Sequence, residues 1–197
     1  MSTENLSRCH RCLKYPEYIA YHDNEWGIPL HDESKHFEML ILESMQAGLS
    51  RWTILSRRNT YRQAFDDFDP VLVSQYDENK VQELMQNSGI IRNQLKIRSA
   101  ISNAKYFLDI YKEFGSFDKY IWWWTDDQVI DNNLQSKEQF VATSELSDKI
   151  SKDLKKRWFR FVWSTIVYAH LQAIGVINDH LVDCFCHEKC KNYNKSI

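Results

Sequence analysis

Glycine and proline are scarce in this sequence, which contains 5 Gly and 3 Pro among its 197 residues. The scarcity argues against an all-β fold, because the many tight turns of such a fold depend on those two residues. Long apolar runs are also missing, and stretches such as Met39–Leu42 are far too short to span a bilayer. The opening residues, MSTENLSRCHRC, lack the apolar segment of a secretory signal. We therefore expect a cytoplasmic protein without a membrane partner.

Neither sign of charge is in excess, since 25 Lys and Arg stand against 27 Asp and Glu. This balance excludes a globally basic nucleic-acid binder, although one face of the molecule can still be basic. Hydrophobic residues make up 43% of the chain and aromatic residues 14%. A chain of this length and composition can bury a sizeable core, which excludes a disordered protein or a small disulfide scaffold.

Helical periodicity dominates the sequence, and there is no strand alternation, repeat or low-complexity tract. The expected helices are one capped by Ser34, one capped by Ser50, one from Asp77 to about Asn87, one from about Ile91 to Phe114, a short aromatic segment 117–124, one opened by Ser144 or Ser147, and one from about Phe159 to Ile174. Residues 125–142 should form a loop. We expect an all-α fold in a single domain over residues 1–197, with a flexible tail at 1–8 and a loose tail at 185–197.

Soft metal ligands gather at the two ends of the chain. All five cysteines lie there, and the pair His180 and Cys184 has the i, i+4 spacing that puts both side chains on one face of a helix. Thiolates and imidazoles are the ligands that tetrahedral zinc prefers, so we favour a metal site joining the ends over ordinary reduced cysteines. Spacing alone leaves open which four residues bind it; the candidates are Cys9, Cys12, His22, His180, Cys184, Cys186, His187 and Cys190.

A lone carboxylate marks a second candidate site. Glu43 is the only charged residue in the eleven-residue stretch from Met39 to Leu49. Its helical neighbours are apolar, so we expect it to be at least partly buried. A buried carboxylate costs several kcal/mol unless it is paired or used. Glu43 is therefore either a functional group or a structural one that pairs with an arginine or caps a buried donor.

A helical hairpin is the third feature. The segment Asn87–Ile91 joins two expected helices by a tight glycine turn, and basic residues such as Arg92 follow. Backbone N–H groups at the start of the second helix suit a DNA phosphate. Basic runs are more often solvated faces, and many helical hairpins have a glycine turn, so this pattern is only moderately specific.

The sequence contains the motifs IAYHDNEWGIP (19–29), HFEMLILES (36–44), QAGLS (46–50), GIIRN (89–93), LKKR (154–157) and INDH followed by Cys184 (177–184). In these motifs it resembles the bacterial DNA-3-methyladenine glycosylase I family. The resemblance runs from about Cys9 to Cys184. The YHDNEWG stretch, at fixed offsets from ES and QAGLS, is a highly specific combination.

The resemblance implies a helix–hairpin–helix glycosylase fold with one structural zinc ion that joins the N- and C-terminal segments. The family's zinc ligands match Cys9, His22, His180 and Cys184, which leaves Cys12, Cys186 and Cys190 spare. It also implies roles for residues of the base pocket and the DNA interface. Glu43 matches the family's base-recognising glutamate and is assigned as catalytic, and Tyr21 matches the pocket tyrosine. Gly48 and Leu49 match the wedge that fills the gap left by the flipped base. The hairpin residues Gly89, Ile90, Ile91 and Arg92 would hold a DNA phosphate.

The implied reaction is excision of alkylated adenine, such as 3-methyladenine, from double-stranded DNA. The damaged base must be flipped into a pocket, because inside the duplex it is out of reach. N3-methylated adenine is cationic on the sugar and leaves as a neutral base, so no strong general acid is needed. Glu43 can bond the donor edge of the base, and water completes the hydrolysis. We see no convincing Schiff-base lysine beside the hairpin and therefore expect no lyase activity, free 3-methyladenine as product, and a monomeric enzyme.

Several pocket positions depart from the family pattern. Arg51 stands where the family has a Trp, with Trp52 one residue later, and Arg11 replaces another family aromatic. Trp158 and Trp163 replace two family glycines. We expect Tyr21 to lie in an extended or irregular segment and to converge with Glu43 on one concave site, with at least one of Trp52 and Trp163 beside it.

These departures keep two other readings open. The first is a non-catalytic DNA-binding relative with a filled or altered base pocket, in which Trp163 could occupy the space between Tyr21 and Glu43. The second is a zinc-stabilised helical interaction module. Release of methylated bases from DNA separates the glycosylase from both, and DNA affinity without base release separates the relative from the module.

Overall fold

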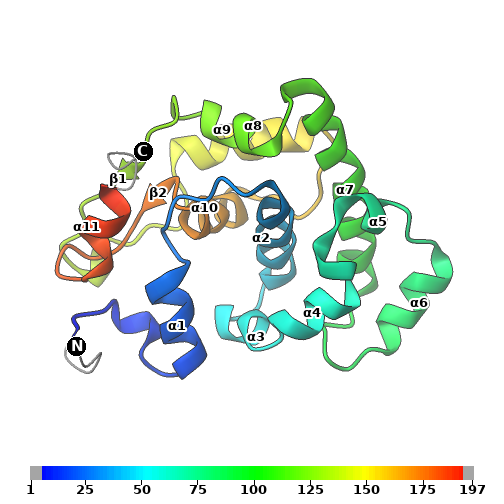
Figure 1. Cartoon of the computed structure of the whole chain (residues 1–197), viewed down its shortest axis with the longest axis horizontal. Coiled ribbons are helices and arrows are strands. Elements are labelled where there is room, and N and C mark those ends of the chain that lie inside the picture. Colours follow the sequence, from blue (N-terminus) through cyan, green and yellow to red (C-terminus); the bar gives the residue numbers. More distant parts are fainter. Residues whose placement is uncertain (1–5, 193–197) are drawn as a thin grey trace.

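Helices make up most of the protein in the computed structural model, which describes residues 6–192 (Figure 1). The α-helices are α1 (Pro16–Asn24), α2 (Glu33–Gln46), α3 (Arg51–Leu55), α4 (Arg58–Ala64), α5 (Pro70–Ser74), α6 (Glu78–Gln86), α7 (Gln94–Phe114), α8 (Phe117–Trp123), α9 (Glu145–Lys156), α10 (Ser164–Ala173) and α11 (Cys186–Lys191). The expected helical fold is thus confirmed. Among the described helices, none has both the length and the apolar character that a bilayer crossing needs.

Side-chain caps start most of these helices, broadly as the sequence predicts. Ser50 Oγ accepts the Thr53 N–H, and Ser144 Oγ accepts the Ser147 N–H at the start of α9. The prediction of Ser34 as a cap is wrong, because Asp32 caps α2 and accepts both the N–H and the hydroxyl of Ser34. A carboxylate at this position also favours the helix N-terminus electrostatically.

Two helix starts are later than predicted. Helix α7 begins after its cap Asn93 rather than at Ile91, because the Ile91 N–H donates to the Tyr61 hydroxyl at 3.1 Å. Helix α10 begins at Ser164 rather than at Phe159. The segment before it has positive φ at Trp158 and Phe161, which a continuous helix cannot contain.

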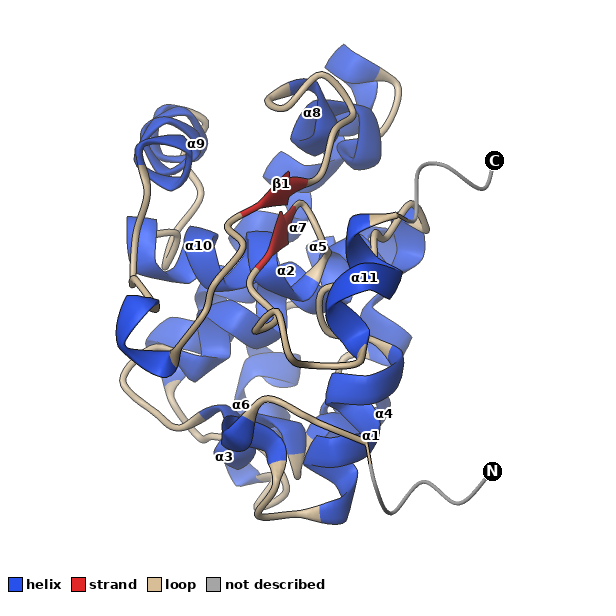
Figure 2. Cartoon of the chain, turned by 90° about the vertical axis from the view of Figure 1, so that its left-hand side faces the viewer, coloured by secondary structure: helices blue, strands red, loops and turns tan. Residues whose placement is uncertain are grey.

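The loop 125–142 contains a short element that the sequence did not reveal. Residues Ile130–Asp131 form strand β1, which pairs in parallel with β2 (Ile177–Asn178). The pair brings the loop against the C-terminal segment, where Figure 2 shows both strands close to α11. Asp131 then accepts hydrogen bonds from His187 at 3.0 Å and pairs with Lys191 at 3.1 Å.

The C-terminal segment is packed rather than loose over the part that the structure describes. Residues 186–191 form α11, and both Cys186 and Cys190 are buried in it. At the other end, Ser7 O accepts the Phe185 N–H, so the two ends run side by side. The remaining residues of the expected tails, 1–5 and 193–197, lie outside the described residues.

Helix α2 is the centre of the core and positions the candidate sites. Every residue from His36 to Met45 is buried, and the helix lies between α10 and α7 (Figure 1). Phe37 packs edge-on against Phe107 of α7, which in turn stacks on Phe117 of α8. Because α2 is enclosed on all sides, a carboxylate in its last turns is held away from bulk water.

Candidate functional site

Two cysteines and two histidines from opposite ends of the chain form one buried cluster. The ligand atoms of Cys9, His22, His180 and Cys184 all lie within 4.8 Å of one another. Cys184 Sγ is 3.6 Å from His22 Nε2 and from His180 Nδ1, and Cys9 Sγ is 3.7 Å from His180 Nδ1. Donor atoms around tetrahedral zinc are about 3.3–3.8 Å apart, so these separations suit a four-coordinate metal ion.

Surrounding groups fix the orientation of both imidazoles. His22 Nδ1 donates to Asp23 at 2.8 Å, and Arg8 in turn donates to both oxygens of that carboxylate. His180 Nε2 donates to the Trp26 carbonyl at 2.9 Å. Such bonds leave the other ring nitrogen of each histidine free to bind a metal. The donor set, the separations and these outer partners together show a site that could hold a metal ion.

Gly27 gives His180 the room that this arrangement needs. A Cβ atom on Gly27 would lie 2.8 Å from His180 Nε2, and the residue has a φ of +79°. Both the close approach and the left-handed backbone favour glycine. The spare cysteines Cys12, Cys186 and Cys190 are buried close by but outside the four-residue cluster.

The cluster already stabilises a thiolate at one of its ligands. Hydrogen bonds from the Cys186 and Cys9 thiols hold the pKa of Cys184 below its ordinary value, and the bond to Cys184 raises the pKa of Cys9. Metals bind the thiolate rather than the thiol, so the surroundings of Cys184 favour the ligating form.

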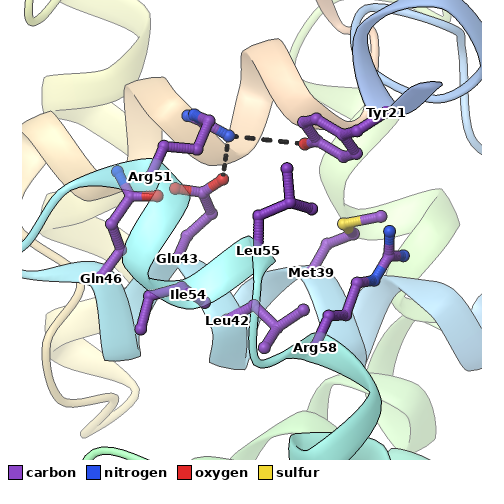
Figure 3. Close-up of a pocket in the computed structure, with 9 residues that line it drawn as sticks. All are labelled: Tyr21, Met39, Leu42, Glu43, Gln46, Arg51, Ile54, Leu55 and Arg58. Atoms are coloured by element: carbon purple, nitrogen blue, oxygen red, sulfur yellow. Dashed lines mark hydrogen bonds and ion pairs between the residues drawn. The ribbon is translucent and has the colours of Figure 1, made fainter. Parts of the chain in front are cut away.

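Tyr21 and Glu43 line one small cavity, drawn in Figure 3 with the other residues that form its wall. Glu43 comes from α2 and Tyr21 from α1, and both are buried. The prediction of an extended or irregular segment at Tyr21 is wrong, since residues 16–24 are helical. Neighbouring helix residues point about 100° apart, which still lets His22 face the metal cluster while Tyr21 faces the cavity.

Arg51 occupies the space between those two side chains. Its Nη1 donates to Glu43 Oε1 at 2.7 Å and to the Tyr21 hydroxyl at 3.4 Å (Figure 3). The cavity that remains is about 30 Å³, close to the volume of one water molecule. Arg51 also lines a second small cavity beside Arg11, Tyr18 and Phe140. Arg51 therefore borders both cavities.

One oxygen of the Glu43 carboxylate has no partner. Glu43 is 5% exposed, and its Oε2 is buried without a hydrogen bond. An unpaired buried acceptor is costly, and such atoms are rare in folded proteins. Burial raises the pKa of Tyr21, so its hydroxyl stays neutral and can donate as well as accept. The site thus contains an unpaired acceptor at Glu43 Oε2, the neutral Tyr21 hydroxyl and the guanidinium of Arg51.

The structure does not bring the two predicted wall tryptophans to this cavity. Trp52 stacks on Tyr15 with ring centroids 3.8 Å apart, outside the cavity wall. Trp163 is 59% exposed and lines a separate surface cavity with Trp158. It therefore does not fill the space between Tyr21 and Glu43. The residue that does fill it, Arg51, was noted in the sequence only as the replacement of an aromatic residue.

Most backbone donors of the expected hairpin turn already have partners. The turn between α6 and α7 has Gly89 N–H donating to Asn87 Oδ1 at 2.9 Å, and Ile90 N–H directed to the Asn87 carbonyl at 3.5 Å. The Ile91 N–H is also used within the fold, whereas the Arg92 side chain is exposed. The turn therefore exposes the cationic Arg92 side chain, whereas the N–H groups of residues 89–91 are already hydrogen-bonded within the fold.

The expected wedge lies at the end of α2. Gly48 and Leu49 are exposed, and Gly48 has a φ of +76° with open space around it. The carbonyls just before them are held by Lys96, whose ammonium donates to Met45 O at 2.8 Å and to Ala47 O at 2.6 Å. Lys96 belongs to α7, so the wedge and the hairpin are joined by this one side chain.

Comparisons with known proteins agree with this architecture. The family model described as methyladenine glycosylase matches residues 11–187. The chain is 42% identical to DNA-3-methyladenine glycosylase 1 of Escherichia coli strain K12 over 182 residues, covering 92% of this chain and 97% of that protein.

Solved structures agree as well. A crystal structure of 3-methyladenine DNA glycosylase I matches with a TM-score of 0.89 at 44% identity, covering 92% of this chain and all of the other. A variant of 3-methyladenine DNA glycosylase I in complex with 3-methyladenine matches with the same TM-score at 33% identity, covering 91% and 97%. The chain therefore belongs to the methyladenine glycosylase family.

Proposed function

We propose that this protein hydrolyses the N-glycosidic bond of 3-methyladenine in double-stranded DNA after flipping the base into the Tyr21–Glu43 cavity. The observation that carries the proposal is the unpartnered, buried Glu43 Oε2 in a cavity that a tyrosine hydroxyl also lines. This oxygen can accept a hydrogen bond from the amino group of a flipped adenine. The choice of substrate follows the names of the relatives, which are 3-methyladenine glycosylases.

Hydrolysis of this glycosidic bond needs little catalytic assistance from the protein beyond binding of the base. Methylation at N3 makes the adenine a cation, and cleavage of the bond to C1′ releases it as a neutral base while the sugar becomes oxocarbenium-like. Glu43 favours the positive charge on the base before cleavage, and water then adds to C1′. Lys96 is the lysine beside the hairpin, and its ammonium is bound to two carbonyls. This engagement supports a monofunctional enzyme without lyase activity.

We assign the DNA contact to the wedge and the hairpin. Leu49 is 39% exposed at the end of α2 and would fill the gap that the flipped base leaves. Arg92, together with the backbone of residues 89–91, would hold a phosphate of the duplex. Since several N–H groups of the turn are engaged, the charge of Arg92 carries more of this contact than the backbone does.

The four-residue cluster is assigned to zinc. Two thiolates and two imidazoles suit zinc, and four protein ligands leave no open position for catalysis. The ion would therefore be structural: it would tie α1 to the C-terminal segment and fix the helix that aims Tyr21. All five cysteines are free thiols in the structure, which suits the reducing cytoplasm to which we assign this monomer.

Arg51 must move before a base can bind. Its planar guanidinium is bonded to Glu43 and Tyr21 as a planar cationic base would be, so it acts as an internal stand-in for the substrate. Moving it would enlarge the two small cavities that it borders. The cost of breaking this ion pair would be offset by the bonds that the incoming base forms with the same carboxylate.

A second candidate function is favoured by the same contact. If the Arg51–Glu43 pair never opens, the protein is a DNA-binding relative that does not excise bases. Base release by the wild type separates the two cases. Replacement of Arg51 by Trp or by Leu then tests whether the cation closes the cavity, because both variants remove the cation and only the first adds an aromatic wall. In the glycosylase, the wild type releases base and both variants bind free 3-methyladenine more tightly. In the non-catalytic relative, the wild type releases none.

Base release from methylated duplex DNA tests the proposal. The wild type should liberate free 3-methyladenine, and Glu43→Gln should release it more slowly. Loss of a charge-assisted hydrogen bond costs about 1.5–3 kcal/mol, which corresponds to a roughly ten- to hundred-fold lower rate if the bond is made mainly in the transition state. Glu43→Gln should still fold and keep its zinc content, although loss of the ion pair with Arg51 lowers its unfolding midpoint. Equal rates for wild type and variant would remove Glu43 from the mechanism.

A further inference from the structure

The surface cavity lined by Trp158 and Trp163 is larger than the Tyr21–Glu43 cavity, and the proposed mechanism does not use it. Its volume is about 520 Å³, within the range of about 300–1,000 Å³ typical of ligand sites. Two tryptophans line it, Trp158 and Trp163, which are 71% and 59% exposed. Leu95 lines it as well and is 71% exposed. We call it the tryptophan cavity.

Trp158 takes a backbone conformation that normally belongs to glycine. Helix α9 ends in a Schellman motif, with the Trp158 N–H donating to Lys155 O and the Phe159 N–H to Leu154 O, both at 3.0 Å. Trp158 occupies the left-handed position of that motif with a φ of +70°. Burial does not repay the strain, because most of the indole is in solvent. Strained residues of this kind gather at binding sites, and this one points to a function outside folding.

The segment that carries both tryptophans is fixed to α7. The buried Asn103 donates to Arg160 O at 2.9 Å and accepts the Arg160 N–H at 2.8 Å. The cavity therefore lies over the first turns of α7, beside Leu95. The next residue, Lys96, holds the carbonyls in front of the wedge. The tryptophan cavity and the expected wedge thus flank the same helix start.

Positive charge surrounds the two indoles. The Lys155 ammonium lies 4.3 Å from the centre of the Trp163 ring, and Arg160 also lines the cavity. None of the described residues that line it is acidic. A neighbouring cavity adds Lys152 and Lys156, together with the acidic Asp148. Exposed aromatic rings beside cations suit a ligand that has a planar ring and a negatively charged group attached to it.

We propose that the tryptophan cavity binds an unpaired nucleotide of DNA, stacking its base on an indole and placing its phosphate against Lys155 or Arg160. Stacking on exposed aromatic rings beside cations is how proteins hold single strands without reading their sequence. The inference rests on the proposed action on DNA, since flipping a base out of a duplex leaves its partner base unpaired. It adds a second nucleotide site, distinct from the Tyr21–Glu43 cavity.

The test uses the full chain and a labelled oligothymidylate of eight nucleotides, followed by fluorescence anisotropy. The probe contains no adenine, so the base pocket does not contribute to its binding. The double variant Trp158→Gly with Trp163→Gly should bind the probe about five-fold or more weakly for each tryptophan removed. Trp123→Ala is the matched control, because Trp123 is 63% exposed on α8 and does not line the cavity.

Free 3-methyladenine should bind the double variant as it binds the wild type, and Glu43→Gln should bind the oligothymidylate as the wild type does. If methylated DNA releases no base while the double variant still loses the oligothymidylate, the proposed function fails and this inference stands. Equal affinity in wild type and double variant, or an equal loss in Trp123→Ala, would overturn it. So would sedimentation showing that the tryptophans only join two copies of the chain.

Discussion

Trp158 is a residue whose replacement should stabilise the protein. It is the left-handed residue that ends α9, where a side chain with a Cβ atom costs about 1–2 kcal/mol. Trp158→Gly removes that strain and gives up little burial, because the indole is mostly exposed. We expect the free energy of unfolding, measured in urea, to rise by about 1 kcal/mol.

The same substitution at Trp163 is the control for that prediction. Trp163 is also exposed but has an ordinary φ of −61°, so glycine relieves no strain there. Trp163→Gly should leave the free energy of unfolding unchanged or lower it. If both variants gained the same stability, backbone strain would not be the cause.

His170 should make stability depend on pH. It is 1% exposed on α10, and neither ring nitrogen has a partner. Burial lowers the pKa of His170 to about 3, whereas an unfolded histidine has a pKa of about 6.5. Between pH 6.5 and about pH 3, His170 is therefore protonated in the unfolded chain but neutral in the folded protein. The free energy of unfolding should fall as the pH drops from about 6.5 toward 3, by up to ~1.4 kcal/mol per pH unit from this group.

Urea titrations of wild type and His170→Leu at several pH values isolate this contribution. The free energy of unfolding of the variant should fall less steeply as the pH drops. The difference in slope from the wild type should correspond to the uptake of one proton on unfolding. Metal ligands and surface carboxylates titrate equally in both proteins, so they cancel in the difference. Parallel curves would mean that His170 is not the group responsible.

At the residue scale, the sequence predicted environments better than partners. Glu43 was expected to be buried and either paired with an arginine or functional, and the structure shows it both paired with Arg51 and holding one free oxygen. The identity of the arginine could not be read from the chain, because α3 turns back over α2 only in the folded protein. The positions of Trp52 and Trp163 were missed for the same reason.

At the scale of elements, Lys96 joins α7 to the end of α2. Its ammonium satisfies two carbonyls that the helix end would otherwise leave unpaired. Lys96→Met keeps most of the apolar stem and removes both bonds, so the free energy of unfolding should fall by about 1.5–3 kcal/mol. Amide exchange at residues 47–49 should also become faster. Lys105→Met, at an exposed position of the same helix, should change neither measurement.

Helix boundaries show where local sequence signals end. The caps Ser50 and Ser144 were predicted correctly, because a hydroxyl that accepts an N–H three residues later is a local interaction. The starts of α7 and α10 were predicted too early. Their preceding segments are fixed by Tyr61 and Asn103, which come from distant parts of the chain. Hydrophobic periodicity alone does not contain those contacts.

At the scale of the whole molecule, the cluster of Cys9, His22, His180 and Cys184 joins α1 to the C-terminal segment. Metal-free protein should have a lower unfolding midpoint, and its amide exchange should rise in residues 9–27 and 177–187. The hairpin of α6 and α7 should exchange as before, because it lies outside the joined segments. Hydrogen exchange with mass spectrometry, before and after chelation, makes the comparison.

Elemental analysis of two cysteine variants supplies the control. Cys9→Ala should lose bound zinc, whereas Cys12→Ala should keep one ion per chain, since Cys12 lies outside the four-residue cluster. Zinc retained in Cys9→Ala, or unchanged exchange after chelation, would contradict the assignment. Spacing alone could not choose among the eight candidate ligands, and the family resemblance selected the four residues that the fold brings together.

The most direct measurement is a crystal structure of the protein soaked with free 3-methyladenine. We predict that the base binds in the Tyr21–Glu43 cavity, with its amino group bonded to the Glu43 carboxylate and the Arg51 guanidinium displaced from its bond to Glu43. The aromatic variant Arg51→Trp should take up the base at lower concentration. A saturated crystal in which Arg51 keeps its bond to Glu43 and the base is absent or bound elsewhere would contradict the proposed base site.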